Sequence, residues 1–298
     1  MRSILVAIAL VLVIPALPAN AETVYQAVDL SSKWNARFQD ADQRYVEGNV
    51  ILGGVPFRIP VGGRNQWNFG SQYGDTYVGT TRTDFAIGVS GVREVHTLMH
   101  TAWGAGGPTC YLSLEFYGSQ GAYYKKDLIG GVDIRDWNNW ILTNTINGTT
   151  TICVESYGGG QRRRDKQCMT LPAEFLTQRL EYMRIVDSGA YNFQRGCLTG
   201  LSVLRDLPAQ TVGLSNKAFG SAAVARSEPQ CSFTLWGKAH IIDSSTLTID
   251  DGSGQTVTIA APGYTGITEG DYVRASGAFT LAGGKPMLTC PAARVRKL

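Results

Sequence analysis

The sequence predicts an all-β protein in which a β-sandwich is followed by a small barrel. Glycine is abundant, at 35 of 298 residues, and with prominent Thr, Val, Tyr and Trp it favours many short strands joined by turns. Tyr111–Tyr117 alternates apolar and polar residues, as a strand with one core face requires. After residue 230, five short strand-like segments with glycines at the bends have the pattern of an OB-like barrel.

The chain begins with the features of a secretory signal peptide over residues 1–21. Arg2 precedes an apolar run from Ile4 to Ile14, and Ala19-Asn20-Ala21 has the small-x-small form of a cleavage site. The run is too short for a comfortable membrane span, and no second long apolar segment follows. We therefore expect a secreted, periplasmic or extracellular protein with no membrane span.

The first folded part, residues 22–206, is organised around Leu52–Trp67, LGGVPFRIPVGGRNQW. Pro56 and Pro60 cannot donate to a sheet ladder, which favours an edge strand or a rim, and the paired glycines allow sharp reversals. Alternation or β-branched content predicts further strands within 24–38, 75–89, 92–101, 111–117, 141–146, 149–154, 180–186 and 200–204. Asn147-Gly148 is a hairpin signal and, with Thr149, also a glycosylation sequon.

The segment 92–101 decides whether two histidines can bind a metal. Its β-branched residues favour a strand, on which His96 and His100 share a face about 13 Å apart at ~3.3 Å per residue. That separation is too large for one ion to bind both imidazoles. The sequence therefore predicts no metal site here.

Six cysteines in an exported chain favour structural disulfides over thiol chemistry or a zinc site. We expect a disulfide between Cys153 and Cys168, which bracket one loop, and another between Cys231 and Cys290, which bracket the last segment. Cys110 and Cys197 are the two cysteines that remain for the third pair. The loop inside the first pair, Gly158–Lys166 (GGGQRRRDK), is predicted to be flexible and solvated. An anion or nucleic-acid contact through its arginines is the alternative.

Residues 207–230 lose periodicity and gain Ala, Ser, Gly and Pro, which predicts a linker. The second folded part then covers residues 231–298. Its expected strands are 233–241, 246–250, 256–260, 272–278 and 287–295.

Several motifs of the first part carry a family resemblance: Val28-Asp29-Leu30-Ser31, Leu52-Gly53-Gly54-Val55-Pro56-Phe57, Val95-His96-Thr97-Leu98 with Trp103-Gly104, and Asp133-Ile134-Arg135-Asp136-Trp137. With them, roughly residues 23 to 206 resemble bacterial secreted domains of the galactose-binding-like jelly-roll type, including carbohydrate-binding modules. The tail, with Asp250-Asp251-Gly252-Ser253-Gly254, looks like bacterial OB-fold accessory domains. The resemblance implies an antiparallel jelly-roll β-sandwich and glycan binding. A structural calcium is common in such domains, but no run of carboxylates places one here, and no motif demands a cofactor.

Sugar sites on β-sandwiches need flat apolar faces and a few converging amides, guanidiniums and carboxylates. Segments predicted at turns supply these residue types: Trp67, Asn68, Trp103, Arg135, Asp136, Trp137, Asn138, Asn139 and Trp140. For each tryptophan the alternative is packing in the core or at the rim. Arg135 could equally pair with Asp133 or Asp136 to hold a loop.

The sequence thus predicts a secreted, non-catalytic protein that binds a glycan or cell-wall polysaccharide. The alternative is an exported structural or adhesion module that contacts protein partners in the cell envelope. A glycoside hydrolase would need two positioned carboxylates, and the chain has no Gly-x-Ser-x-Gly, His-Glu-x-x-His or Walker motif. The net charge of +3 is too small to imply nucleic acid by itself.

Overall fold

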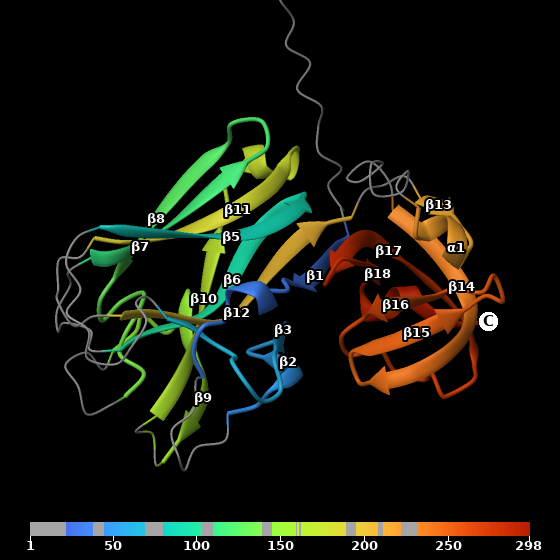
Figure 1. Cartoon of the computed structure of the whole chain (residues 1–298), viewed down its shortest axis with the longest axis horizontal. Coiled ribbons are helices and arrows are strands. Elements are labelled where there is room, and N and C mark those ends of the chain that lie inside the picture. The colour runs from blue at the N-terminus through green and yellow to red at the C-terminus, as the bar shows by residue number, and fades with distance from the viewer. Residues whose placement is uncertain are drawn as a thin grey trace, which may run out of the picture.

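The computed structural model describes residues 22–37, 45–68, 80–102, 110–138, 145–158, 160, 162–188, 195–207, 211–221 and 232–298. These residues form an all-β protein with a sandwich and a small closed barrel, which confirms the predicted fold class. The two parts lie side by side (Figure 1). Among the described residues, no helix has the length and apolar character needed to cross a membrane.

The sandwich consists of two antiparallel sheets. The first runs in the order β1-β12-β6-β10-β9, with β4 also paired to β12, and the second in the order β5-β11-β7-β8. The strands of the first sheet are β1 (Thr23–Ala27), β4 (Trp67–Asn68), β6 (Val92–Ala102), β9 (Thr151–Tyr157), β10 (Arg162–Thr170) and β12 (Arg195–Asp206). Those of the second are β5 (Thr81–Ser90), β7 (Cys110–Gly118), β8 (Tyr123–Ile129) and β11 (Arg179–Asp187). Two 3-10 turns, η1 (Ser31–Lys33) and η2 (Ala173–Leu176), lie between strands.

The core of the sandwich forms where the two sheets face each other. Leu114 and Phe116 of β7 are buried together with Val95 and Met99 of β6 in one apolar cluster. The alternation predicted for residues 111–117 therefore points its apolar face inward, as expected for a strand with one core face. Burial of this cluster is the main stabilising contribution to the sandwich.

A separate hairpin covers the outer face of the first sheet. It consists of β2 (Gly48–Leu52) and β3 (Val55–Ile59), joined by Gly53 and Gly54 at φ values of 55° and 76°. Phe57 of this hairpin is buried in one cluster with Leu98 of β6. The prediction of an edge strand bounded by glycine reversals is confirmed.

The barrel closes because β14 pairs with both β15 and β17, giving a ring of five strands. Its strands are β14 (Ser232–Asp243), β15 (Thr246–Asp250), β16 (Thr256–Ala260), β17 (Tyr272–Ala282) and β18 (Lys285–Thr289). The short β19 (Val295–Lys297) follows the 3-10 turn η3 (Ala292–Arg294) and pairs with β17 in antiparallel orientation. Two of the predicted segments, 246–250 and 256–260, match their strands residue for residue.

Part of the predicted linker belongs to the barrel. β13 (Thr211–Gly213) pairs with β14 in parallel, and α1 (Asn216–Phe219) follows it. Phe219 is fully buried, with its ring 5.7 Å from that of Phe233 and 5.3 Å from that of Phe279. Residues 211–221 thus contribute a plug to the barrel core.

The basic segment is a strand, which contradicts the prediction of a solvated loop. β10 begins at Arg162, and Arg163, Arg164 and Asp165 are buried between its neighbours β9 and β6. The charges are tolerated because they are paired: Arg164 forms an ion pair with Glu155 of β9.

The expected disulfides are absent, since Cys153, Cys168, Cys197 and Cys290 are free thiols and each expected pair includes one of them. For the first pair the reason lies in the strand register. Cys153 is aligned with Asp165, whereas Cys168 lies three residues further along the same strand. Because side chains alternate along a strand, the two thiols project from opposite faces of the sheet. Cys231 and the side chain of Cys110 lie outside the described part of the chain.

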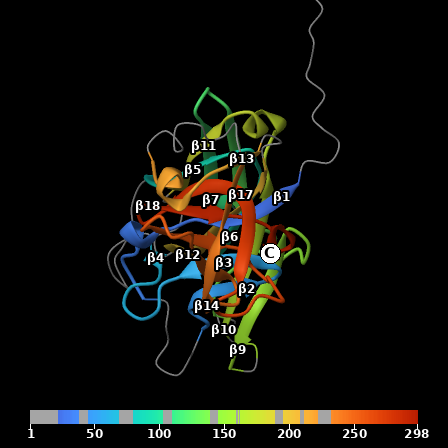
Figure 2. The same cartoon turned by 90° about the vertical axis from the view of Figure 1, so that its right-hand side faces the viewer.

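The barrel rests against β1 and the β2–β3 hairpin (Figures 1 and 2). Gln26 Nε2 donates to Thr280 Oγ1 at 2.5 Å in a buried hydrogen bond across this junction. Arg294 forms an ion pair with Glu22 at the start of the described chain. These contacts join the two parts through polar groups.

Candidate functional site

A cleft of about 310 Å³ lies at the junction between the sandwich and the barrel. The sandwich contributes to it from β1, β2 and β3, and the barrel contributes from β14, β16, β17, β18 and the segments next to them. Its lining includes Tyr25, Asn49, Val50, Phe57, Arg58, Thr246, Thr258, Lys285 and Met287.

The lining of the cleft combines apolar and hydrogen-bonding groups. Phe57 is buried, and Val50 and Met287 are partly exposed apolar residues of the lining. Hydroxyls come from Thr246, Thr258 and other residues of the barrel strands. A concave site with an apolar surface and a few polar groups is the usual composition of a small-ligand pocket.

One amide of the lining is already held in place. Asn49 Nδ2 donates to Asp243 Oδ2 at 3.2 Å and lies 3.4 Å from Thr246 Oγ1. Burial alone would raise the pKa of Asp243, but hydrogen bonds from Ser245 and Asn49 hold that pKa below its ordinary value. The carboxylate therefore stays ionised and fixes the amide across the junction between the two parts.

The predicted sugar-binding residues fall in several different environments. Trp67 is 5% exposed, and its ring packs edge-on against Phe85 at 5.2 Å, so it belongs to the sandwich core. Asn68 exchanges hydrogen bonds with Asn35, through its backbone carbonyl at 2.8 Å and its backbone N–H at 2.7 Å. Trp103, Asn139 and Trp140 lie outside the described residues, so their role stays a prediction.

The side chains of the segment from Arg135 to Asn138 are held by contacts with other groups of the protein. Arg135 pairs with Asp165 of β10, a partner that the sequence alone did not indicate. Asp136 is fully buried and accepts the backbone N–H of Asn138 at 2.8 Å. The ring of Trp137 has the guanidinium of Arg162 over it at 4.7 Å. These polar and aromatic groups therefore brace the end of the sheet.

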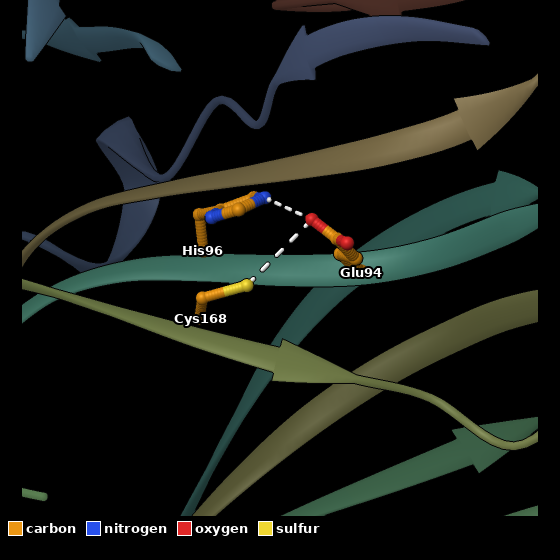
Figure 3. A group of neighbouring side chains, drawn as sticks. All are labelled: Glu94, His96 and Cys168. Atoms are coloured by element: carbon orange, nitrogen blue, oxygen red, sulfur yellow. Dashed lines mark hydrogen bonds and ion pairs between the residues drawn. The ribbon is translucent and has the colours of Figure 1, made fainter. Parts of the chain in front are cut away.

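A second cluster was not predicted from the sequence and consists of Glu94, His96 and Cys168 (Figure 3). Glu94 and His96 are two residues apart on β6, and His96 is aligned with Cys168 of β10, so all three share one face of the sheet. Glu94 Oε2 lies 3.1 Å from His96 Nε2 and 3.6 Å from Cys168 Sγ. The spacing Glu94-x-His96 is visible in the sequence. Cys168, however, reaches the cluster only because β10 pairs with β6.

The environment of this cluster keeps its histidine and thiol uncharged. His96 is 3% exposed, and burial lowers its pKa to about 4, although Glu94 acts in the opposite direction. Burial also raises the pKa of Cys168 to about 11, and the nearby Glu94 adds to the effect. Lys166 lies on the same side, where its Nζ donates to the carbonyl of Gly53 at 2.6 Å.

Tyr25 connects the two sites. Its ring is 5.5 Å from that of His96 in an edge-on contact, and the same residue lines the cleft. Burial and the charge of Glu94 raise the pKa of its hydroxyl. Tyr25 therefore contacts the cluster and also lines the cleft.

Comparison with known proteins gives little further guidance. No protein-family model matches the chain, and no curated protein matches it. Among solved structures, dimeric latent PorU from Porphyromonas gingivalis shows a TM-score of 0.25 and 11% identity. The match covers 76% of this chain and 18% of that protein, and at this similarity it carries no argument. Fold and site define an all-β protein with a sandwich, a barrel and a cleft between them.

Proposed function

We propose that this protein is an exported, non-catalytic glycan-binding protein that holds a sugar in the cleft between sandwich and barrel. The observation that carries the proposal is the lining of that cleft, in which hydroxyls and an amide surround an apolar surface. The resemblance of the first part to galactose-binding-like domains and the signal-peptide pattern of residues 1–21 support the same function.

The dimensions of the cleft suit one or two sugar rings. Ligand pockets are typically about 300–1,000 Å³, and this cleft lies at the lower end of that range. A pyranose presents apolar C–H faces and a rim of hydroxyls. Val50 and Met287 offer surface for the faces, while Asn49 and Thr258 offer partners for the rim.

The charged groups of the cleft favour an acidic sugar. Among the described residues that line it, Arg58 and Lys285 carry charge, and both are cations. Arg58 already forms an ion pair with Asp29, in which Arg58 Nη1 lies 3.2 Å from Asp29 Oδ2. Lys285, by contrast, is exposed where it lines the cleft. A uronate carboxylate placed near Lys285 would gain an attraction that a neutral sugar lacks.

The proposal is tested by isothermal titration of the purified chain with a panel of neutral and uronate-containing oligosaccharides. Thr258→Phe places a ring inside the cleft and is expected to weaken binding at least about tenfold. Thr256→Phe is the matched control, because Thr256 is exposed on the same strand and does not line the cleft. Equal behaviour of the two variants, or no binding across the panel, would reject the cleft as the sugar site.

A second variant separates the charge contribution from the shape of the cleft. Lys285→Gln should weaken binding of uronate-containing sugars and leave neutral ones unchanged. Lys217→Gln serves as its control, because Lys217 is a surface lysine of α1 outside the cleft. Equal losses for neutral and acidic sugars would contradict the preference for acidic ligands.

A further inference from the structure

We propose that Glu94, His96 and Cys168 form a binding site for a single divalent metal ion of the zinc class. The three side chains project from one face of the first sheet, two from β6 and one from β10 (Figure 3). Each offers one ligand atom, and these atoms all lie within 4.8 Å of one another. The proposed glycan binding in the cleft does not depend on this site.

The spacing of the ligand atoms fits a tetrahedral ion. Zinc–ligand bonds of about 2.0–2.3 Å place neighbouring ligand atoms roughly 3.3–3.7 Å apart. The separations from Glu94 Oε2 are 3.1 Å to His96 Nε2 and 3.6 Å to Cys168 Sγ. A small outward movement of the half-exposed Glu94 would admit the ion without any change in the strands.

The choice of ion follows from the donors. Thiolate sulfur, imidazole nitrogen and carboxylate oxygen together are the ligand set of zinc, whereas calcium and magnesium take oxygen ligands alone. In the sequence, neither the pair of His96 and His100, four residues apart along one strand, nor the spacing of the cysteines predicted a metal site. Cys168, which completes the set of three ligands, comes from the neighbouring strand β10.

An independent observation is the hydrogen bonding of His96. The imidazole is buried, yet among the described residues neither ring nitrogen has a partner with hydrogen-bond geometry. Its Nε2 nevertheless points at the carboxylate of Glu94 (Figure 3). A cation between the two groups would bind the buried nitrogen, whose contact with Glu94 lacks hydrogen-bond geometry and therefore carries a cost in stability.

The charges balance when the metal binds. The ion displaces the proton of the Cys168 thiol, so one proton is released per ion bound, and no electron is transferred. Thiolate and carboxylate then neutralise the divalent charge. Three protein ligands leave one position of a tetrahedral ion for water or another small donor, as in zinc sites that remain open. Tyr25, whose ring is 5.5 Å from that of His96, also lines the cleft.

The experiment is a titration of the reduced, metal-free protein with Co²⁺, a spectroscopic substitute for zinc, followed by competition with Zn²⁺. We expect one equivalent to bind with a thiolate-to-cobalt charge-transfer band and the strong visible bands of a four-coordinate ion. Cys168→Ser should abolish the charge-transfer band. Cys153→Ser is the matched control, since Cys153 faces the opposite side of the same sheet.

Two further variants test the other two ligands, and their unfolding midpoints check that they fold. Glu94→Gln and His96→Gln should each lower cobalt affinity by at least the roughly 10–100-fold that loss of an outer-shell partner costs in known sites. Their metal-free thermal unfolding midpoints show whether the fold is retained. A charge-transfer band that persists in Cys168→Ser, or a wild-type titration without a sulfur band, would overturn the proposal.

Discussion

Arg135 and Asp165 form a two-point ion pair inside the sandwich. Arg135 Nε lies 2.6 Å from Asp165 Oδ2, and its Nη2 lies 2.6 Å from Oδ1. Their side chains are 9% and 1% exposed. The pair joins the segment before Trp137 to strand β10, and it raises the pKa of Arg135 against the opposing effect of burial. Arg135, which the sequence predicted to bind sugar, is thus held by a structural contact.

Removal of one member of this pair should destabilise the protein strongly. Arg135→Ala leaves the carboxylate of Asp165 buried without its partner, and we expect the free energy of unfolding to fall by about 3–5 kcal/mol. Urea unfolding followed by tryptophan fluorescence measures the loss. Arg184→Ala is the control, because its pair with Asp84 is partly exposed and should contribute less than about 1 kcal/mol. Comparable losses in the two variants would contradict the structural role assigned to Arg135.

The local sequence pattern was sufficient to predict much of the fold. Residues 246–250 and 256–260 alternate apolar and polar side chains, and the structure makes them strands with those bounds. The hairpin around Gly53 and Gly54 was likewise predictable, since both residues adopt positive φ.

Contacts between distant strands were not predictable. Arg164 is fully buried in a segment that looked like a solvated loop, because its partner Glu155 is on another strand. The cluster of Glu94, His96 and Cys168 also depends on the register of β6 against β10, which the sequence does not reveal. Hydrophobic periodicity finds elements, whereas ion pairs and metal ligands depend on which elements become neighbours.

Acid should destabilise the fold through His100, whose pKa burial lowers to about 3, with a further contribution from Arg164. The unfolded histidine has a pKa of about 6.5. Between about pH 6.5 and 3 the unfolded chain therefore binds more protons, so stability is lost as the pH falls through that window. One such group changes the free energy of unfolding by up to about 1.4 kcal/mol per pH unit.

This pH dependence is measured by urea unfolding between pH 7 and 5 with a chelator present. His100→Asn removes the titrating group, so its free energy of unfolding should depend less steeply on pH than that of the wild type. The comparison uses slopes, because the substitution also changes the packing of a buried site. An unchanged slope would show that His100 does not carry the acid sensitivity.

A methyl group at Gly277 should disrupt the barrel. A Cβ atom there would lie 2.2 Å from the carbonyl oxygen of Thr289 and 2.6 Å from Cβ of Cys290. The obstacle is backbone, so Gly277→Ala should cost at least about 1–3 kcal/mol of stability. Gly220→Ala is a milder counterpart, since its nearest neighbour is the side-chain oxygen of Gln255 at 3.2 Å. Thermal unfolding distinguishes them, and equal midpoints would contradict the contact.

The free thiols predict an order of chemical reactivity. Cys153 is exposed, whereas Cys197 and Cys290 are fully buried, and burial raises the pKa of all three thiols, that of Cys290 to about 12. Because the thiolate is the reactive form, iodoacetamide should modify Cys153 in the native protein and reach the buried pair only after unfolding. Peptide mapping by mass spectrometry follows each site, and Cys153→Ser should remove the fast reaction. A bridged peptide containing Cys153 and Cys168, or modification of Cys290 as fast as that of Cys153, would contradict the strand register that separates these thiols.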